Sequence, residues 1–517
     1  MDVALVSTEP KKNTEDKYLA YIGAEWVEPD GSRTIPNLCP AHKDAVLGQL
    51  AVCTQQQVDR AMQAAAQAFP AWRGVSGDLK MKAFLLAAHI MEEQKQEWMR
   101  RMTREMGKSL FDAKLDMDEG IGATQVLATQ GVSMKGDTYP MQVPGMVMES
   151  RPEPRGVALI ITPFNFPIAI PAAQVVAALV SGNTVVWKPS SLVPELSQAL
   201  VAAIEAALQE VASRRGVKIP PGVINLVTAD GQVGDYMVRH PVPAVLSFTG
   251  SKQIGDHLDS VASGLGKRVM KEVAGINIYY VHRHADMERA VRNFLYGKTI
   301  TSGQRCTSIQ ELLCDKEVYE DFLALAMERA KGVIMGDGLS DELAHADATP
   351  GMFSLPPMVS QKQFERLRGL LAKSVQQGGR IRYQAQVPDH LRDEGYYFPL
   401  TFIDNVGREN VLYSEEAFGP VGVCTPVRDV NEAIETINNK IGIVACIDSR
   451  DKDVSEHFIQ QVLRTRVDDG RHGTGCLWGT RFGGDRGAGS GNPSLDQEMV
   501  YGYTLWKTIY RTYRPPE

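Results

Sequence analysis

Short apolar segments alternate with helix-like segments from residue 156 onward, and this alternation constrains the fold more than any other feature of the chain. Four segments have the composition of buried strands: GVALIIT (156–162), TVVWK (184–188), GVINLV (222–227) and AVLSF (244–248). Helix-like segments such as AAQVVAALV (172–180) lie between them. Strands separated in this way pair in parallel through right-handed crossovers. We therefore predict an α/β fold with a doubly wound sheet, and a second alternating region from about 278 to 476 predicts a further α/β unit.

The flanking segments have other patterns. Residues 56–132 carry apolar side chains at spacings of three and four, which predicts helices. The segment DTYPMQVPGMVMES (137–150) has β-prone residues on both sides of Pro144-Gly145 and predicts a hairpin, and its prolines favour an edge or an arm. The segment YTLWKTIYRTY (503–513) predicts a final strand.

The composition excludes several classes of protein. Hydrophobic residues make up 44% and charged residues 23%, which is typical of a globular enzyme. A net charge of −7 without any run of Lys or Arg argues against a nucleic acid partner. Seven dispersed cysteines with no C-x2-C pair indicate neither a disulfide scaffold nor a zinc site, so we expect no metal. The first residues lack a signal-peptide pattern, and the most apolar stretch (168–180) is too short to span a bilayer. We expect a cytoplasmic protein with no membrane partner.

Four places in the sequence can carry chemistry, and each has a structural alternative. Cys306, among small polar residues in TSGQRCTS, is either a thiolate stabilised by N–H groups or a buried hydrophobe. Glu272, which enters an apolar strand, is either a general base with a raised pKa or a solvated charge. Asn165, in ITPFNFPIAI, either forms an Asx-turn or donates to a site. Gly250, in FTGSKQIG, begins a turn that can face a pyrophosphate, although the chain has no G-x-G-x-x-G.

Six motifs resemble those of the aldehyde dehydrogenase superfamily: TPFNFP, GNTVVWKPS, FTGS, EVAGIN, SGQRCTS and EEAFGPV. The resemblance covers almost the whole chain, as far as FGGDRGAGSG (482–491). Glu272 and Cys306 are 34 residues apart, the separation of base and nucleophile in that superfamily. The resemblance implies a Rossmann-like cofactor domain (1–135 and 156–272), a catalytic α/β domain (273–487) and a small β oligomerisation arm (136–155 and 488–517).

The resemblance also implies roles for individual residues. Cys306 would be the nucleophile, Asn165 would hold the oxyanion together with the Cys306 main-chain N–H, and Glu272 would activate water to release the acid. Residues expected to bind NADP or NAD are Lys188, Ser191, Gly250, Ser251, Glu416, Phe418, Thr162 and Trp187. Among them, Lys188 would reach the adenosine ribose and Glu416 the nicotinamide ribose. The substrate would be a small-molecule aldehyde.

Two departures from the family pattern affect these expectations. Ser191 stands where NAD-preferring relatives often carry a glutamate that bonds the ribose 2′-hydroxyl. A serine does not repel a 2′-phosphate and Lys188 can pair with it, so we expect NADP to be used. Gln174 replaces the lysine that many relatives use in a proton relay with a C-terminal glutamate, and SGNPSL (490–495) supplies no acid. We therefore expect the proton from Glu272 to leave through water and backbone groups.

Two other functions compete with a hydrolytic aldehyde dehydrogenase. A CoA-acylating relative typically lacks the base, so Glu272 argues against that function. A non-catalytic structural relative would have lost Cys306, Asn165 or Glu272, and all three are present. The substrate walls would come from Phe164, from residues beside Cys306 and from the loop that holds Trp478, Arg481 and Phe482. Arg481 either anchors the carboxylate of a semialdehyde or faces solvent.

The arm leads to an expectation about assembly. It cannot bury its own large side chains, which are Tyr139, Met146, Met148, Trp506 and Tyr510. Such a strand pair adds to the sheet of a neighbouring subunit. We therefore expect a homodimer or a homotetramer.

Overall fold

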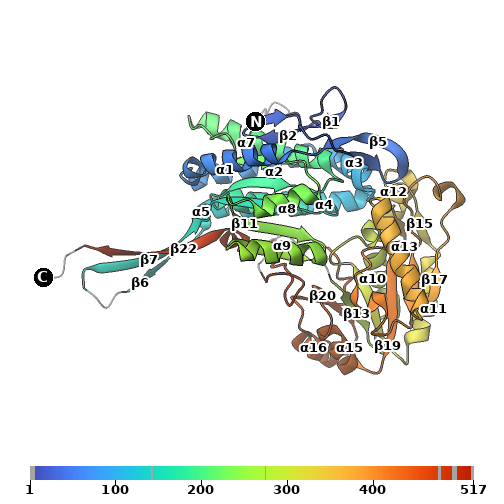
Figure 1. The fold of residues 1–517 in the computed structure, drawn as a ribbon. Helices are drawn as coiled ribbons and strands as arrows, with labels where there is room; N and C mark the ends of the chain where they lie inside the picture. The colour runs from blue at the N-terminus through green and yellow to red at the C-terminus, as the bar shows by residue number, and fades with distance from the viewer. Residues whose placement is uncertain are drawn as a thin grey trace.

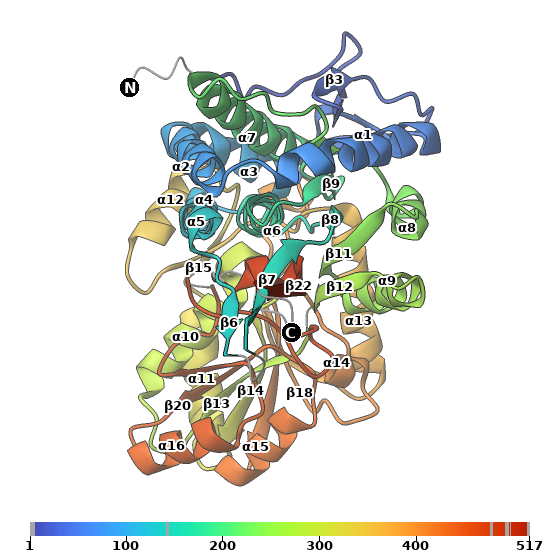
Figure 2. The same ribbon diagram turned by 90° about the vertical axis from the view of Figure 1, so that its left-hand side faces the viewer.

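The computed structural model describes residues 6–140, 144–273, 275–475, 479–491, 496 and 498–513. Helices and strands form two α/β units, each built on a largely parallel sheet, and an arm that projects from the first unit (Figures 1 and 2). The predicted α/β fold class is confirmed. None of the described helices combines the length and the apolar character needed to cross a membrane.

The first sheet contains seven strands among the described residues. In spatial order they are β12 (Arg268–Val273), β11 (Pro243–Gly250), β8 (Val157–Ile161), β9 (Thr184–Lys188), β10 (Ile224–Leu226), β2 (Ala20–Ile22) and β3 (Glu25–Val27). The strands from β12 to β10 pair in parallel, and β2 and β3 extend the sheet in antiparallel pairing. The four strands predicted between residues 156 and 248 all belong to the parallel part.

Helices cover both faces of this sheet because the side chains of each strand alternate between them. Ala158 and Ile160 belong to a core shared with α2 (Gly77–Glu93), α3 (Lys95–Met106), α4 (Leu110–Ala128), α6 (Ala169–Val180) and α7 (Pro194–Arg214). Leu159 and Ile161 belong to a core shared with α1 (Gln55–Arg73), α8 (Gly231–Arg239) and α9 (Lys252–Gly264). The short helix α5 (Gln130–Ser133) and a small sheet of β1 (Lys17–Tyr18), β5 (His42–Ala51) and β4 (Thr34–Cys39) complete this unit.

The second sheet runs in the order β17 (Arg380–Gln384), β18 (Thr401–Asp404), β19 (Val421–Val427), β14 (Ile309–Asp315), β13 (Asn277–Val281), β20 (Val444–Asp448) and β21 (Arg466–Asp469). All neighbours pair in parallel except β17 and β18. Its helices are α10 (Met287–Thr299), α11 (Tyr319–Ala330), α12 (Asp341–Ala348), α13 (Gln361–Gln376), α14 (Val411–Ser414), α15 (Val430–Asn438) and α16 (Lys452–Gln461). A pair of short strands, β15 (Val333–Met335) and β16 (Phe353–Leu355), lies beside it.

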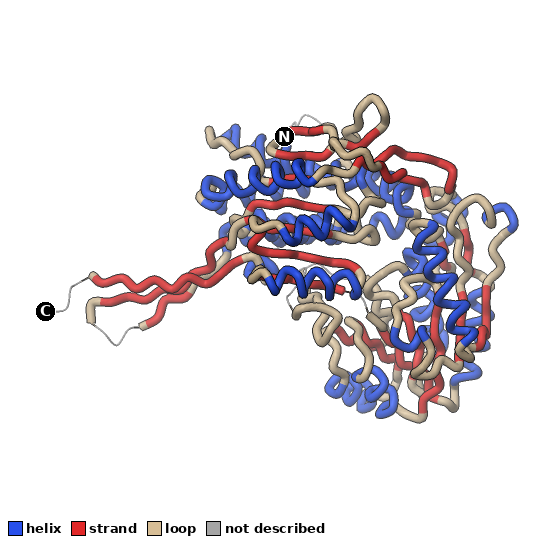
Figure 3. The backbone as a smooth tube through the Cα atoms, viewed as in Figure 1, coloured by secondary structure: helices blue, strands red, loops and turns tan. Residues whose placement is uncertain are grey.

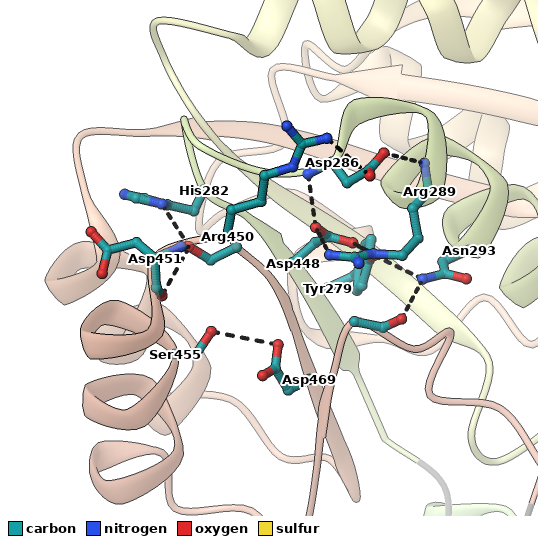
Figure 4. A network of polar contacts seen from close by, with 12 residues as sticks. Tyr279, His282, Asp286, Arg289, Asn293, Asp448, Arg450, Asp451, Ser455 and Asp469 are labelled. Carbon is teal, nitrogen blue, oxygen red and sulfur yellow. Dashed lines mark hydrogen bonds and ion pairs between the residues drawn. The ribbon is translucent and has the colours of Figure 1, made fainter.

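A network of polar contacts joins α10 to the second sheet (Figure 4). Asp448, at the end of β20, accepts hydrogen bonds from Arg289 Nε at 2.9 Å and from Arg289 Nη2 at 2.8 Å. The hydroxyl of Tyr279, on β13, donates to the same carboxylate at 3.2 Å. Asn293 Nδ2 donates to the Tyr279 hydroxyl at 3.3 Å and to Gly470 O at 3.2 Å. Two turns of α10 are thereby fixed to the strands beneath them.

The arm consists of β6 (Asp137–Tyr139), β7 (Met146–Pro154) and β22 (Thr504–Thr512), with β7 between the other two (Figure 3). β7 pairs with β22 along its full length. The Trp506 side chain is 53% exposed and that of Tyr510 is 62% exposed. Near the base of the arm, α17 (Met499–Gly502) packs into the core of the first unit through Met499 and Val500. The arm therefore presents aromatic side chains that this chain does not cover.

The chain passes directly from β12 to β13, and a later segment returns to the edge of β12. Val273 N donates to Ala488 O at 2.8 Å, and Ser490 N donates to Lys271 O at 2.8 Å. The returning segment therefore lies along the end of β12, where Glu272 lies.

Candidate functional site

The backbone just before Cys306 has an unusual conformation. Thr301, Ser302 and Gly303 have φ values of 51°, 51° and 68°, in the left-handed region that is costly for residues other than glycine. Specific contacts hold this turn: the Thr301 hydroxyl donates to Asp112, and the Ser302 hydroxyl donates to Pro356 O. A Cβ at Gly303 would lie 2.4 Å from Gly419 O, so only glycine fits there. The turn fixes the direction in which the chain enters Cys306.

Arg305 anchors the same loop to α4 of the first unit. Its guanidinium is buried and donates to Asp112 on α4, while its Nε donates to the Thr301 hydroxyl at 2.8 Å. It also lies over the ring of Phe166, 4.9 Å from the ring centroid. Burial of a guanidinium without a carboxylate partner would be costly, and Asp112 supplies the opposite charge. Arg305 is therefore engaged within the protein and acts as a support for the loop.

Asn165 is fixed through its main chain by a buried lysine. Lys108 Nζ donates to Asn165 O at 2.9 Å and pairs with Asp116 on α4 at 2.9 Å. The other oxygen of Asp116 accepts from Ala169 N at 2.8 Å, at the start of α6. Asn165 itself is buried. The Asn165 loop is thereby tied to the helix that also holds the Cys306 loop through Asp112.

Glu272 is enclosed by the returning segment. Its Oε1 accepts a hydrogen bond from Gly484 N at 2.5 Å. A Cβ at Gly484 would lie 2.6 Å from this oxygen, and a Cβ at Gly489 would lie 2.8 Å from it, so two glycines make room for the carboxylate. Burial raises the pKa of Glu272 to about 8, and the bond from Gly484 opposes this rise. Glu272 is thus a carboxyl group that gains and loses its proton near neutral pH.

The structure brings the predicted nucleophile and base into one electrostatic environment. Burial, together with the negative charges of Glu272, Glu416 and Glu119, raises the pKa of the Cys306 thiol to about 12. The charge of Arg305 opposes them. The Cys306 carbonyl accepts from Asn277 Nδ2 at 2.6 Å, which fixes the backbone at the entry to β14. The resting thiol is protonated, and Glu272 is close enough for its charge to act on it.

Sequence reasoning did not single out Lys108, Asp112, Asp116 or Glu119. Burial raises the pKa of Glu119 to about 8, and its charge acts on Cys306. A signal for the three acids was present, because residues 112, 116 and 119 share one face of α4 at helical spacing. The same spacing is equally typical of a solvated helix face. Only the buried basic partners of these acids, which the structure shows, distinguish a buried acidic cluster from a solvated face.

Two of the residues expected to bind a dinucleotide end strands of the first sheet: Lys188 ends β9 and Gly250 ends β11. Lys188 Nζ bonds only to Pro189 O, at 3.1 Å, and makes no ion pair within the described part of the chain. Burial lowers the pKa of Lys188 to about 8, with the charge of Asp230 opposing this. Ser251 is the N-cap of α9, yet its hydroxyl makes no capping bond. A lysine without a carboxylate partner and an uncapped helix N-terminus fit the phosphates of NAD or NADP.

Two further residues of this predicted set are already engaged. Trp187 Nε1 donates to the Thr162 hydroxyl at 2.9 Å, and Trp187 is 1% exposed. The Trp187 indole therefore belongs to the core, and only the main chain of this residue is in a position to meet a cofactor. Gly250 is held close to the Phe248 ring, which would lie 2.7 Å from a Cβ at position 250. Ser191 is half-buried and lies three residues beyond Lys188.

Glu416 and Phe418 approach the same region from the second unit. Arg366 donates to Glu416 O at 3.2 Å and to Ala417 O at 2.5 Å. Burial raises the pKa of Glu416 to about 8, with the charges of Arg366 and Lys298 opposing this. Phe418 has a φ of 48°, and its ring meets that of Phe164 edge to face at 6.0 Å. Phe418 thus comes next to the Asn165 loop.

Other sequence predictions concern the proton path and the substrate walls. Gln174 Nε2 donates to the Thr249 hydroxyl at 2.7 Å, and its Oε1 is buried with no hydrogen-bond partner among the described residues. Arg481 pairs with Glu498 and lies 3.5 Å from Asp496, with most of its side chain exposed. Phe482 packs against the core of the first unit that contains Ala158 and Ile160 and against a core of the second unit. Trp478 and the 492–495 part of the SGNPSL stretch lie outside the described residues.

Comparison with known proteins agrees with this arrangement. The profile of the aldehyde dehydrogenase family matches residues 26–509. The chain is 29% identical over 499 residues to the α-ketoglutaric semialdehyde dehydrogenase of Bacillus subtilis, covering 96% of this chain and 98% of that one. It is 28% identical over 483 residues to 1-pyrroline-5-carboxylate dehydrogenase 1 of Halalkalibacterium halodurans, covering 92% and 89%.

Solved structures show the same fold. Betaine aldehyde dehydrogenase from Staphylococcus aureus, in complex with NAD+, superposes with a TM-score of 0.88 at 24% identity, covering 97% of this chain and 96% of that one. An NADP-dependent enzyme from E. coli superposes with a TM-score of 0.86 at 26% identity, covering 98% and 100%. The predicted resemblance is confirmed, as is the predicted class of activity, oxidation of an aldehyde with NAD(P)+. The chain belongs to the aldehyde dehydrogenase family.

Proposed function

We propose that this enzyme oxidises its aldehyde through a covalent bond to Cys306 and releases the carboxylic acid by hydrolysis. The observation that carries the proposal is the shared environment of Cys306 and Glu272, in which the buried carboxyl group acts on the thiol. The Cys306 thiol loses its proton to solvent, which generates the thiolate nucleophile. The thiolate then attacks the aldehyde carbon and forms a thiohemiacetal.

Asn165 and the main-chain N–H of Cys306 stabilise the oxyanion of this intermediate in our proposal. One such donor is typically worth about 3–4 kcal/mol. Lys108 acts as a positioning residue, because it holds the Asn165 carbonyl and so the direction of the Asn165 side chain. When bound, the oxidised nicotinamide supplies the acceptor for the hydride that leaves the thiohemiacetal carbon. Loss of this hydride leaves a thioester on Cys306.

The task of Glu272 in the proposal is the activation of water. Its carboxylate removes a proton from water, the resulting hydroxide attacks the thioester carbon, and the Cys306 thiolate leaves. The enclosing residues 484–489 keep the carboxyl in a poorly solvated setting, which keeps its pKa near neutrality. Acylation of CoA remains the alternative fate of the thioester, and nothing in the geometry of Glu272 favours it.

We infer that both NAD and NADP bind at Lys188, Ser191, Gly250 and Ser251, with Glu416 and Phe418 at the nicotinamide end. Thr162 contributes at the end of β8, and Trp187 contributes by its main chain. The free ammonium of Lys188 supports pairing with a 2′-phosphate. Arg481 has no part in substrate binding in this proposal, since Asp496 and Glu498 already neutralise it. A panel of aliphatic, aromatic and carboxylated aldehydes assayed with both cofactors identifies the substrate class.

The proposed domains follow the three groups of strands: residues 1–135 with 156–272, residues 273–487, and an arm of 136–155 with 488–517. The exposed aromatic side chains of the arm support a homodimer or a homotetramer, in which the arm adds to a neighbouring subunit. A cytoplasmic location is also part of the proposal, and it is supported by the free thiols of all six described cysteines.

One variant tests the central assignment. Cys306→Ala removes the thiol that we assign as the nucleophile, so NAD(P)H production should fall to the uncatalysed level. Cofactor binding, followed by quenching of tryptophan fluorescence, should stay within about threefold of wild type, because the cofactor contacts are elsewhere. Turnover above a trace in this variant would exclude Cys306 as the nucleophile. Cys314→Ala is the matched control, since Cys314 is buried in β14 away from the site and its loss should leave the reaction intact.

A further inference from the structure

Glu119 is a carboxyl group near Cys306 that the proposed reaction does not use. It lies on α4, three residues after Asp116 and seven after Asp112, so the three acids share one face of the helix. Asp112 is bound to the Cys306 loop, and Asp116 is tied to the Asn165 loop through a buried lysine. The face of α4 that carries Glu119 is therefore turned towards the residues of the reaction.

The charge of Glu119 is not neutralised by its surroundings. The side chain is half-buried, and it makes no hydrogen bond and no ion pair with any residue that the structure describes. Three basic side chains act on it, and each already has a carboxylate partner: Arg305 with Asp112, Lys108 with Asp116, and Arg466 with Asp468. A poorly solvated carboxylate without a partner is costly, and a bound cation removes that cost.

Contacts along the chain connect Glu119 with the loop that we expect to form a substrate wall. Arg466, whose charge acts on Glu119, donates to Gly475 O, just before that loop. Gly475 N in turn donates to the hydroxyl of Thr307 at 3.3 Å, next to Cys306. The charge of Glu119 also acts directly on the Cys306 thiol. Glu119, Cys306 and the start of the loop thus belong to one neighbourhood.

The aromatic part of this neighbourhood suits the same kind of ligand. Phe482 packs against the core that contains the buried residues of α4 and against the core that Cys306 also contacts. Aromatic faces attract quaternary ammonium groups. A carboxylate on the substrate would instead be repelled by Glu119, since like charges repel strongly where water is scarce.

We propose that Glu119 is a specificity-determining residue that selects an aldehyde carrying a positive charge, such as a quaternary ammonium group on a short alkyl chain. The ammonium group forms an ion pair with Glu119 and packs against Phe482, while the aldehyde carbon reaches Cys306. This inference rests on the proposed function, because it takes Cys306 as the residue that meets the aldehyde.

Protonation of Glu119 gives the proposal a measurable signature. Burial raises the pKa of Glu119 to about 8, and the charged groups that act on it are Asp116, Arg305, Lys108 and Arg466. At pH 7 the empty site is therefore mostly protonated, and a bound cation should expel close to one proton. Affinity for a permanent cation should rise about tenfold per pH unit below pH 8 and level off above it. Cys306 and Glu272 also titrate nearby, and Glu119→Gln keeps both, so the variant isolates the contribution of Glu119.

Isothermal titration calorimetry on the full-length enzyme without cofactor tests the cation site in the absence of turnover. The probes are choline and 4-trimethylammonio-1-butanol. Their neutral counterparts, in which a tert-butyl group replaces the trimethylammonium group, are 3,3-dimethylbutan-1-ol and 5,5-dimethylhexan-1-ol. At pH 8.5 at least one cation should bind at least tenfold more tightly than its counterpart. Titrations at pH 7 in phosphate and in Tris, which differ in ionisation enthalpy, count the protons released.

Two variants locate the site. Glu119→Gln should abolish both the preference for the cation and the release of a proton. Asp118→Asn is the matched control, because the neighbouring Asp118 is an acid on the same helix that pairs with Lys95 and Lys114. It should leave both properties unchanged, and thermal melting checks that both variants fold. The proposal is overturned if neither cation binds better than its counterpart, or if Glu119→Gln keeps the preference.

Steady-state kinetics connect the site with the reaction. We expect kcat/KM to be highest for 4-trimethylammoniobutanal, lower for the neutral 5,5-dimethylhexanal and lowest for the anionic succinic semialdehyde. Glu119→Gln should lower the first value at least tenfold, through KM. Equal oxidation of all three aldehydes, or a preference for the anion, would overturn selection by Glu119 and leave the proposed function standing. If no aldehyde yields an acid while binding of the cation still depends on Glu119, the proposed function fails and the cation site remains.

Discussion

The main-chain N–H of Gly484 donates to Oε1 of Glu272 over 2.5 Å, and this bond joins the end of β12 to the segment that returns along its edge. It is the contact that lowers the pKa of Glu272, against a larger rise caused by burial. The balance leaves the pKa at about 8. A group that titrates near neutral pH suits a general base, because it exists in both protonation states under working conditions.

The first prediction concerns the pH dependence of acid release. Glu272 acts as a base only when it is deprotonated, so the rate of acid release should rise about tenfold per pH unit below pH 8 and level off above it. Glu272→Gln should lower steady-state turnover by about 10²-fold and abolish this limb of the profile. Stopped-flow absorbance should still show a burst of about one NAD(P)H per site in the variant. Acid release at the wild-type rate would rule out Glu272 as the base.

The same pKa shift predicts an effect on stability with a definite sign. The folded-state pKa of Glu272 is raised from 4.5 to about 8, so between these values the native protein keeps a proton that the unfolded chain has lost. Stability contributed by this group is therefore full below pH 4.5 and is lost as pH rises towards 8. Each unit of pKa corresponds to about 1.4 kcal/mol, so the cost of ionisation is on the order of 4–5 kcal/mol above pH 8.

Glu272→Gln cannot ionise and should avoid this cost. Its free energy of unfolding should exceed that of wild type at pH 9, and the difference should shrink towards pH 5. Urea denaturation at several pH values measures both curves. If the difference in the free energy of unfolding between Glu272→Gln and wild type does not change with pH, the raised pKa is contradicted.

A third prediction tests the space around the carboxyl group. Gly484→Ala places a methyl group 2.6 Å from Glu272 Oε1 and 2.5 Å from Ala488 O, so either the carboxyl or the segment must move. We expect kcat to fall at least tenfold with the burst retained, because acid release depends on Glu272 and hydride transfer does not. Gly369→Ala, where a Cβ meets nothing within 4 Å, is the control and should leave kcat unchanged. An unaffected kcat in Gly484→Ala would mean that this bond does not position the base.

The parallel strands could be predicted from the sequence because their signal is local. Val157 to Ile161 are all buried, so the strand is apolar throughout, and helical segments on either side dictate the crossover. Cys306, Glu272 and Asn165 could be named from short motifs for the same reason. The neighbours that identify each of these residues lie within a few positions of it in the sequence. The resemblance to the family supplied their roles.

The supports of the site could not be predicted, because they depend on contacts between distant segments. Lys108 reaches Asn165 across 57 residues, and Arg305 reaches Asp112 across 193. No local pattern predicts that a lysine in the connection between two helices will lie beneath a loop of another motif. The left-handed backbone of Thr301 and Ser302 could not be predicted either, because neither residue favours that conformation and tertiary contacts impose it.

The last prediction concerns the choice of cofactor, where the chain departs from the family pattern. Ser191 carries no negative charge, and Lys188 has no carboxylate bonded to it within the described residues. The nearest acid acting on Lys188 is Asp230, and Arg33 already pairs with it at 2.6 Å. The local charge is therefore compatible with a 2′-phosphate. We expect the KM for NADP to be no more than about tenfold that for NAD, a difference of at most about 1.4 kcal/mol.

Ser191→Glu should shift the preference towards NAD, because a carboxylate at this position repels the 2′-phosphate and accepts a hydrogen bond from the 2′-hydroxyl. We expect the ratio of kcat/KM for NAD over NADP to rise at least tenfold. Ser191→Ala is the matched control, since it removes the hydroxyl without adding charge and should change the ratio far less.

Helix α8 begins at Gly231, just after Asp230, so residues 229–232 are the part of the fold that could block a phosphate whatever residue occupies position 191. Steady-state kinetics with both cofactors show whether Ser191 or this segment determines the cofactor. A wild-type enzyme with no measurable NADP activity would mean that the segment, and not Ser191, determines the choice.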